Sequence, residues 1–529
     1  MSTSSSSSSY SINSSTSSSG KTRITGLYSS MDIDSLVKSS LTNEQSKIDK
    51  VKQSIQYDEW KQEAYRAVNT ALATFQDSFL NDTNATSSIA SGTYMNAKTT
   101  TLSGTNTSGI SVTATSDVQM DELTIDSFTK ATKAHMESTV IPVDAGTTVP
   151  EMTISALITK TGATPTYTVK DGKNYVDFSI NGKDFSMSTD ATVSDMMKTI
   201  NNTTGIGAKI YYSTFSGKFE MDSTSTGESS NFSITDTSGI LVGAAGVFGV
   251  GDGSGKVQTA GTAGAAKNAT IVVEGKTLSF ESNSFSVDGY NFNISADSTS
   301  AVNVKSTTDT DSIFNRITSF VKAYNTLVTS ISSQLTEKKN LTYKPLTDAQ
   351  KSDMTETTIA QWETKAKAGI LRSDSDLSNL MSTVRGLINT QTSSSGLNLA
   401  SIGITTGTYK TCPNGQLVID EDKLKNAIQN NSGAVSDLFT KTAQFGTAES
   451  KYNSSGLIYK MDSLITKYTK NSTDVTLANL TKDITSLTDR RDSLQDLFSD
   501  KEDKLYSKYS ALETALSQMN SSTAFLSNS

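Results

Sequence analysis

The sequence predicts a discontinuous multidomain α+β protein, in which long terminal coiled-coil helices and a helical domain carry inserted β-rich domains. Three observations support this. Apolar residues recur at helical spacing near both ends of the chain, short alternating runs separated by Gly and Asn fill the middle, and helical spacing then returns. Because helix both precedes and follows the strands, we expect the β-rich block to be an insertion in a helical framework.

Length and composition exclude several classes of protein. The 529 residues suffice for three or four domains, and a hydrophobic content of 35% favours several modest cores over one large core. The net charge of −8 argues against nucleic-acid and anionic-membrane partners. No run of 18 apolar residues is present, so no transmembrane helix is expected, and a single cysteine, Cys412, excludes an intrachain disulfide.

The periodicity divides the chain into eight segments. We expect a disordered Ser-rich segment (1–20), an N-terminal helix (21–56), a helical domain (57–97 and 305–476), a β-rich domain (98–150 and 267–304), a second β-rich domain inserted in it (151–266), and a C-terminal coiled-coil helix (477–529). The first segment has too little apolar surface to offset the entropy of ordering.

Residues 31–80 carry two helical stripes. One stripe falls at heptad spacing and comprises Leu41, Ile48, Val51 and Ile55. The second is wider and comprises Tyr65, Val68, Leu72, Phe75 and Phe79. The change of stripe near Asp58 indicates either two helices or one helix that serves two neighbours.

The middle of the chain alternates as strands do. The clearest hairpin spans 175–188 with Asn181-Gly182 at its turn, and similar hairpins centre on Ser216-Gly217 and Glu274-Gly275. Helical spacing resumes over about 310–335 and 374–388, and a short hairpin lies near residue 415.

The last helix has an unusually long apolar stripe. Heptad core positions step from 477 to 519, and ten of them are apolar, while Arg491, Lys501 and Lys508 interrupt the stripe. A helix of this length measures roughly 65 Å, more than the diameter of a small domain. Its candidate contact residues are Leu480, Ile484, Leu487, Leu494, Phe498, Leu505, Leu512 and Met519.

Residues 33–55 are the simplest partner for this stripe, because they are also heptad-like. That partner is shorter and interrupted, so part of the C-terminal stripe stays uncovered. We therefore expect the surplus to contact other copies of the chain or a different protein, as in a subunit of a polymer.

Catalytic and metal-binding patterns are missing from the sequence. The only histidine, His135, has Lys, Met and Glu neighbours, and Cys412 falls in a turn. The Gly-rich run 243–256 departs from the phosphate-loop pattern at Val250 and Val257. We expect no catalytic site, no cofactor and no bound metal, and hence no enzyme.

Four stretches resemble one known family. They are RITGLYSSMDIDSLVKSSLTNEQSKID (23–49), ATVSDMMKTINNTTGIGAKIYYSTFSGKFEMDSTSTGESSNFSIT (191–235), SIFNRITSFVKAYNTLV (312–328) and LASIGITTGTYKTCPNGQLVIDEDKLKNAIQNNSGAVSDLF (399–439). In this order they resemble the hook-associated protein 2 family, the bacterial proteins that cap the flagellar filament. The second stretch is similar to the repeat shared with flagellins.

The resemblance implies a structural cap at the distal end of the filament. It implies a homo-oligomeric ring, a pentamer, that promotes folding and insertion of exported flagellin and prevents its loss. The implied partners are the protein itself, flagellin, the hook-associated junction proteins during assembly, an export chaperone and the type III export apparatus, with residues 1–20 as an export segment. The protein would be secreted and lie at the filament tip.

The resemblance also makes the terminal helices legs that grip the filament. The residues expected at assembly contacts are Ile24, Leu27, Leu41, Ile48, Val51, Ile55, Leu480, Ile484, Leu487, Leu494, Phe498, Leu505, Leu512 and Met519.

Two alternatives stay open. A flagellin-like or hook–filament junction protein shares the heptad ends and the repeat. The Tyr324-Asn325 pair and the block from Ile402 to Leu417 favour the cap. A secreted surface adhesin that binds glycan or a host protein is an alternative of another class, but it normally requires an anchor or a signal sequence.

Overall fold

The chain folds into two units, and the structure is a computed structural model. It describes residues 13–16, 20–25, 31–81, 84, 87–142, 148–249, 257–259, 264–391, 396–408 and 414–527. One unit joins Met1–Met95 to Asp311–Ser529, and the other is Asn96–Thr310. The first is mainly helical and the second mainly strand, so the predicted α+β class with an inserted β region is confirmed.

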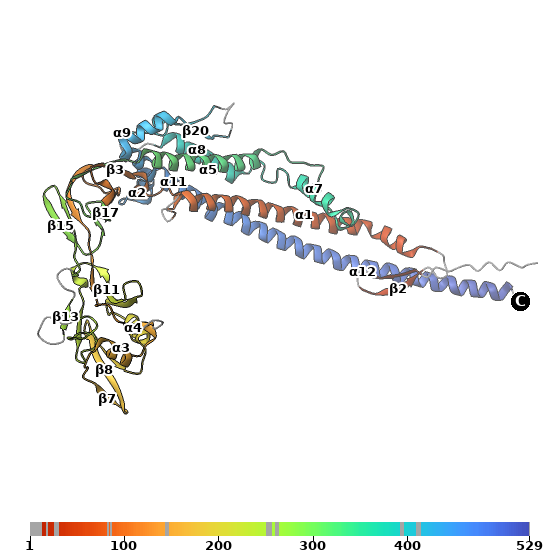
Figure 1. Cartoon of the computed structure of the whole chain (residues 1–529). Coiled ribbons are helices and arrows are strands. Elements are labelled where there is room, and N and C mark those ends of the chain that lie inside the picture. The colour runs from red at the N-terminus through yellow and green to blue at the C-terminus, as the bar shows by residue number, and fades with distance from the viewer. Residues whose placement is uncertain are drawn as a thin grey trace, which may run out of the picture. The chain divides into compact units, whose positions relative to one another are not determined.

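Two long helices dominate the helical unit (Figure 1). Helix α1 (Ile33–Phe75) starts at Asp32, whose carboxylate accepts a hydrogen bond from the Ser35 amide at 3.0 Å. It runs through Asp58 without a break, so the two sequence stripes belong to one helix with two sets of neighbours. Helix α12 (Asp474–Ser527) has 54 residues.

The other helices of this unit pack around an aromatic core. Phe320 of α5 (Thr310–Thr336) has ring centroids of Phe75 and Phe79 at 5.7 and 6.3 Å, and that of Phe439 at 6.3 Å. Phe439 belongs to α9 (Glu421–Thr440). The remaining elements are α2 (Gly92–Met95), α6 (Asp348–Ser352), α7 (Glu356–Lys367), α8 (Ser375–Thr390), α10 (Ala448–Ser454), α11 (Leu457–Lys467), β19 (Ile404–Thr406) and β20 (Leu417–Ile419).

Both long helices carry a π-helical turn near this core. Turn η1 (Gln76–Leu80) follows α1, and η5 (Tyr468–Thr473) joins α11 to α12. The Gln76 amide donates to Asp462 of α11 and, at 2.9 Å, to the Thr466 hydroxyl. The two turns therefore lie where the long helices meet the rest of the unit.

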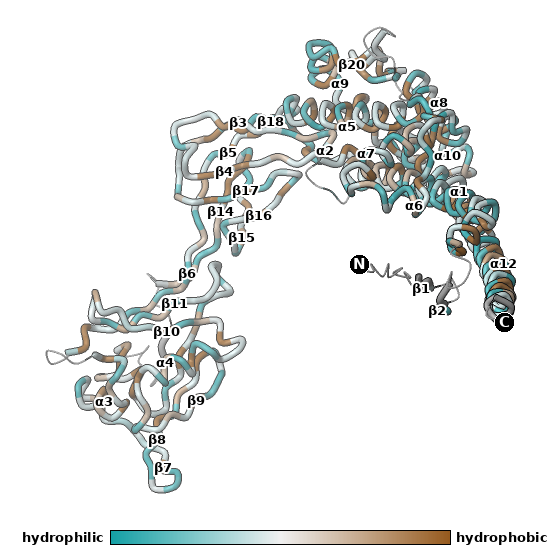
Figure 2. The backbone as a smooth tube through the Cα atoms, turned by 90° about the vertical axis from the view of Figure 1, so that its right-hand side faces the viewer, coloured by the Kyte–Doolittle hydropathy of each residue, from teal (hydrophilic) through white to brown (hydrophobic). Residues whose placement is uncertain are grey.

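The β unit contains two separate cores, and Figure 2 shows their strands as two groups. The first core lies between a five-stranded sheet, ordered β15-β14-β5-β18-β3, and a three-stranded sheet, ordered β16-β17-β4. These strands are β3 (Lys98–Gly104), β4 (Ile110–Ala114), β5 (Glu122–Thr129), β14 (Ala269–Val273), β15 (Lys276–Phe280), β16 (Ser284–Val287), β17 (Tyr290–Ile294) and β18 (Val302–Thr308). A short 3₁₀ turn, η2 (Thr107–Gly109), precedes β4.

The second core is built from residues between Ala134 and Ala266. One sheet has the order β10-β11-β6, and another has the order β13-β12-β8-β7 with β9 beside β8. The elements are β6 (Lys133–Glu137), η3 (Val149–Glu151), α3 (Ile154–Thr161), β7 (Thr168–Lys170), β8 (Lys173–Ile180), β9 (Lys183–Ser188), α4 (Val193–Asn202), β10 (Ala208–Ser213), β11 (Lys218–Thr226), η4 (Glu228–Ser230), β12 (Ser233–Asp236) and β13 (Val257–Thr259).

All three hairpins predicted in the middle of the chain are confirmed. Strands β8 and β9 pair around Asn181-Gly182, β10 and β11 around Ser216-Gly217, and β14 and β15 around Glu274-Gly275. Asn181 and Gly182 have φ of 49° and 72°, the left-handed pair that a tight hairpin turn requires.

Two expected segment limits differ from the structure. The inserted domain was expected to begin at residue 151, but strand β6 pairs with β11, and Ala134 and Met136 already belong to the second core. Alternation predicts a strand without indicating which sheet it joins. Of residues 1–20, which were expected to be disordered, only 13–16 and 20 are described, and there β1 (Asn13–Thr16) pairs with β2 (Thr22–Thr25). Such pairing needs only backbone groups, which a Ser-rich segment also provides.

Within the described residues, no helix combines the length and the apolar character needed to cross a lipid bilayer.

Candidate functional site: the terminal helix pair and its unpaired end

Helices α1 and α12 form an antiparallel pair, and three contacts fix its register (Figure 1). The Gln62 amide donates to the Thr481 hydroxyl at 2.9 Å, and Lys501 forms an ion pair with Glu44. The Tyr506 hydroxyl donates to Asp34 at 2.9 Å. Residue numbers along α12 increase while those of the contacting residues on α1 decrease. The structure therefore contains the predicted pairing between the two ends of the chain.

The predicted residues of α1 lie in the seam between the helices. Leu41, Ile48, Val51 and Ile55 are all buried, and Ile33 and Val37 extend the stripe to the start of α1. On α12, Leu480 is buried, and the half-buried residues are Ile484, Leu487, Leu494, Phe498 and Leu505. The register of the pair places Leu487 and Leu494 opposite Ile55 and Ile48 of α1.

Beyond Phe498 the predicted heptad positions hold at Leu505 but not at the two lysines. Lys501 and Lys508, expected at core positions, are exposed, whereas Tyr506 is buried and Tyr509 packs beside it against Ile33, Val37 and Leu41. An α-helix drifts by about 20° per heptad unless it supercoils, so a long straight helix presents a 3.6-residue stripe. After Phe498, the face of α12 that lies toward α1 therefore continues in two steps of four residues, first to Glu502 and then to Tyr506.

Beyond Tyr509 the helix has no α1 beside it, because α1 begins only at Ile33 (Figure 1). We call residues 510–527 the overhang, and they extend α12 by about 27 Å. Leu512 and Met519 are 43% and 62% exposed. Leu512, Leu516 and Met519 lie within about 60° of each other on the helix, and we call these three residues the overhang stripe.

Of the predicted N-terminal site residues, Ile24 lies in β2 and pairs with Ser14, and Leu27 lies outside the described residues. Lys21, just before β2, forms an ion pair with Asp503 at 2.7 Å. The β1–β2 hairpin is therefore held beside α12 near the end of the helix pair.

Charged groups flank the seam with opposite effects. The hydrogen bond from Lys501 holds the pKa of Glu44 below its ordinary value. Burial, followed by the nearby charge of Asp483, raises the pKa of Asp58. The pair thus contains one favourable charge contact and one repulsive carboxylate contact across the two helices.

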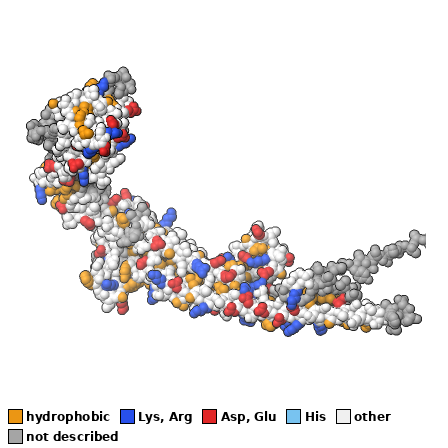
Figure 3. All heavy atoms as spheres, turned by 90° about the horizontal axis from the view of Figure 1, so that it is seen from below, with side chains coloured by type: hydrophobic (Ala, Val, Ile, Leu, Met, Phe, Trp, Pro, Cys, Tyr) orange, Lys and Arg blue, Asp and Glu red, His pale blue; other side chains and the backbone are white. Residues whose placement is uncertain are grey.

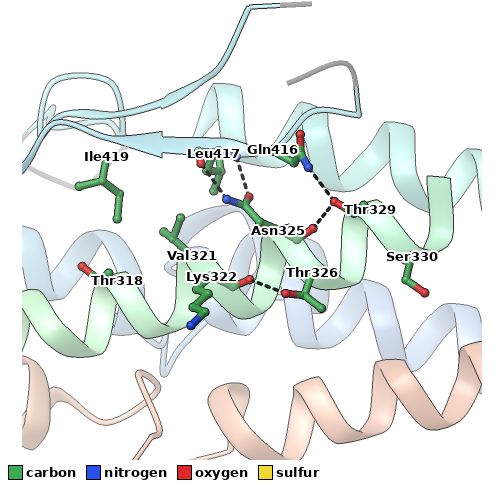
Figure 4. A pocket seen from close by; sticks show the side chains of 10 residues that line it. All are labelled: Thr318, Val321, Lys322, Asn325, Thr326, Thr329, Ser330, Gln416, Leu417 and Ile419. Atoms are coloured by element: carbon green, nitrogen blue, oxygen red, sulfur yellow. Dashed lines mark hydrogen bonds between the residues drawn. The ribbon is translucent and has the colours of Figure 1, made fainter. Parts of the chain in front are cut away.

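A polar clamp is the second organised feature of the helical unit (Figure 4). The Asn325 amide donates to the Leu417 carbonyl at 2.8 Å, and its oxygen accepts from the Leu417 amide at 2.7 Å. Gln416 donates to the Thr329 hydroxyl at 2.7 Å. Tyr324, the neighbour of Asn325 in the sequence, is buried, and burial raises its pKa to about 12. A groove of about 700 Å³ runs beside this clamp.

The described residues contain no cluster of three or more His, Cys, Asp or Glu that could hold a metal ion. His135 is exposed and its Nδ1 lies 2.6 Å from Asp222, as expected for a surface histidine. Cys412 and residues 250–256 of the Gly-rich run lie outside the described residues. On the face drawn in Figure 3, acidic and basic side chains are intermixed, and no large area carries one sign.

Paired terminal helices with an exposed apolar end, in one chain with small β-rich domains, are typical of structural proteins. Two family models match this chain. The model of the flagellar hook-associated protein 2 C-terminus matches residues 266–521, and that of the N-terminus matches residues 29–156. Together they cover well over half of the chain, which therefore belongs to the flagellar hook-associated protein 2 family, a family of structural proteins and not of enzymes.

Individual relatives agree with this assignment. Flagellar hook-associated protein 2 of Halalkalibacterium halodurans is 26% identical over 443 residues, which are 80% of this chain and 79% of that protein. The protein of the same name from Thermotoga maritima is 26% identical over 47% of this chain and 38% of its own length. The solved D1-D2-D3 domains of the flagellar cap protein FliD from Escherichia coli match 79% of this chain and 99% of theirs. Their TM-score is 0.54 at 19% identity, so this likeness concerns the fold.

Proposed function

We propose that this protein is a subunit of the cap at the distal end of the flagellar filament, where copies form a homo-oligomeric ring. The observation that carries the proposal is the overhang. An amphipathic helix is stabilised when its apolar stripe is covered, and in the overhang stripe Leu512 and Met519 are exposed while Leu516 is half-buried. A filament end or a neighbouring copy supplies that cover.

The overhang also favours a ring of copies. A contact between an overhang on one subunit and a different surface on the next is head-to-tail, and such contacts close into rings when the rotation permits. The pentamer implied by the sequence resemblance remains a prediction, tested by the mass of the assembled particle in solution.

The partners follow from membership of the family. We propose that exported flagellin folds and inserts beneath the ring and that the ring prevents its loss. We further propose that the protein reaches the filament tip outside the cell through the type III export apparatus with an export chaperone. It would meet the hook-associated junction proteins when the first cap assembles.

Complementation tests this function. A flagellated strain that lacks its own cap protein is expected to release monomeric flagellin, and the wild-type chain is expected to restore filaments. A variant with Leu512→Ser, Leu516→Ser and Met519→Ser should be exported and still release flagellin, because its overhang stripe is polar. The matched control is Thr514→Ser with Gln518→Ser, on the opposite face of the overhang, which should restore filaments. Full rescue by the stripe variant would contradict the proposal.

A further inference from the structure

A second groove of the helical unit, of about 410 Å³, lies between α5 and α8. Its lining combines hydroxyl groups with one positive charge and includes no Asp or Glu. Its polar lining includes Ser332, Thr336, Ser378, Ser382, Arg385 and Asn414. The groove takes no part in the helix pair or in the overhang.

Arg385 is the only charged residue in this lining, and its charge is incompletely satisfied. One guanidinium nitrogen donates to the Asn414 carbonyl, and Nε is buried without a hydrogen-bond partner. Among the described residues, no carboxylate lies within ion-pair distance of Arg385. A guanidinium stays protonated at all relevant pH values and has five N–H donors, so most of its bonding capacity is unused.

Packing holds Arg385 in place. A side chain at Gly415 would place its Cβ 2.5 Å from Arg385 Nε, so the guanidinium fits only because residue 415 is glycine. Gly415 also has φ of +78°, in the left-handed region that favours glycine. The cation is therefore pre-positioned at the groove before any ligand arrives.

Hydroxyl donors accompany this cation. Ser378, Ser382 and Arg385 follow each other at i, i+4 and i+7, so they share one face of α8. The hydroxyls of Ser332, Ser378 and Ser382 make no hydrogen bond to the described residues. The Thr336 hydroxyl donates its proton to the Ser332 carbonyl at 2.7 Å, so it is not one of the donors to the groove. A fixed guanidinium with free hydroxyls is the donor set that suits an oxyanion.

We infer that this groove binds an oxyanion, with Arg385 as the charged ligand and the serine hydroxyls as additional donors. The oxyanion is either a side-chain carboxylate of another polypeptide in the assembly or a small free anion such as sulfate. If the only role of Arg385 were to hold the turn at Asn414, oxyanions would not bind in the groove.

Site-specific protection of Arg385 tests this inference on the unaltered full chain. Phenylglyoxal modifies arginine, and peptide mass spectrometry follows each arginine separately, in chloride and in sulfate or acetate at equal ionic strength. At an anion concentration of twice the Kd, about one third of the sites are empty, so modification of Arg385 should slow about threefold. Exposed Arg66 and Arg490 in the same chain are the controls and should react equally in all salts. Equal rates for Arg385 in all salts would overturn the inference.

Variants distinguish a carboxylate of another polypeptide from a free anion as the bound group. They also test the serine hydroxyls without removing Arg385. Ser378→Ala with Ser382→Ala leaves the bond from Arg385 to Asn414 intact and should weaken the protection. If a second copy supplies the carboxylate, Arg385→Gln should lower the oligomer mass in light scattering, sulfate should do the same to the wild type, and Arg66→Gln should not. If the anion is free, protection should occur with no change in oligomer mass. Protection that survives in the double serine variant would contradict the role given to the hydroxyls.

Discussion

The Tyr506 hydroxyl of α12 donates to the Asp34 carboxylate in the first turn of α1, at 2.9 Å. Tyr506 is also buried against Ile33 and Val37. This contact lies close to the place where α1 begins and where α12 continues alone to Ser527. It separates a stretch of α12 that is covered by α1 from one that α1 does not reach, and the two stretches should respond differently to mutation.

Charge inside the covered stretch should open the helix pair. Leu487→Asp with Leu494→Asp places two carboxylates in the seam, and burying an unpaired charge costs several kcal/mol by order of magnitude. We expect lost helicity by circular dichroism, filaments that are not capped, and an unchanged thermal transition of the β unit. Ser486→Asp, at an exposed position on the same helix, is the control. A double variant with parental helicity would show that the seam contributes little.

Protonation of the Asp58 carboxylate should stabilise the helix pair at acid pH. Burial and Asp483 raise its pKa in the folded state above the ordinary 3.8, so the folded protein binds this proton more tightly than the unfolded one. The stability from protonated Asp58 is fully present below pH 3.8 and is lost as pH rises through the raised pKa.

Asp58→Asn should therefore raise the urea midpoint of the helical unit at neutral pH and change it little below pH 3.8. Asp489→Asn, at an exposed position of α12, serves as the control. A midpoint gain of equal size at both pH values would contradict the electrostatic explanation.

Breaking the clamp between Asn325 and Leu417 should destabilise the helical unit. Asn325→Asp replaces the amide donor by an acceptor that faces the Leu417 carbonyl, and an unsatisfied buried group costs about 1–3 kcal/mol. Hydrogen exchange at the Leu417 amide should accelerate, and the urea midpoint should fall. Thr326→Ala removes only a bond to its own helix and should be nearly neutral. Unchanged exchange at Leu417 would mean that β20 is held by other contacts.

A buried carboxylate should be needed for the second core of the β unit. Asp236 is fully buried and accepts five hydrogen bonds, from the Ser238 amide and hydroxyl and from the amides of Gly239, Leu241 and Val242. Asp236→Ala leaves these donors unpaired and should cost at least about 3 kcal/mol. The loss of stability should appear as rapid proteolysis within residues 133–266. Asp190→Asn, at an exposed site, should leave the fragment pattern as in the parent.

Local chemistry made much of this fold predictable. The Asn181-Gly182 turn and the alternation around it specify a hairpin without outside help, and the spacing from Leu41 to Ile55 specifies a helix face. Which strand each predicted strand pairs with was harder to predict from the sequence. Alternation at Ala134 and Met136 indicates a strand, but its pairing with β11 depends on contacts far along the sequence.

Long-range geometry explains the other misses at the candidate site. A heptad count places Lys501 and Lys508 in the seam, whereas the accumulated drift of a straight helix brings in Tyr506 and Tyr509. The sequence analysis singled out the Tyr324-Asn325 pair but could not predict the contact of Asn325 with Leu417, because Leu417 lies 92 residues away. A search with a 3.6-residue period would have found the tyrosines.

The proposed assembly surface is the overhang stripe, and the solution mass of the full chain tests this role. Multi-angle light scattering should show an oligomer for the wild type and for Thr514→Ser with Gln518→Ser. The variant with Leu512→Ser, Leu516→Ser and Met519→Ser should be monomeric, with parental helicity and parental thermal transition, because the overhang lies beyond the helix pair formed with α1. An oligomer of unchanged mass in the stripe variant would contradict the claim that this stripe is an assembly surface.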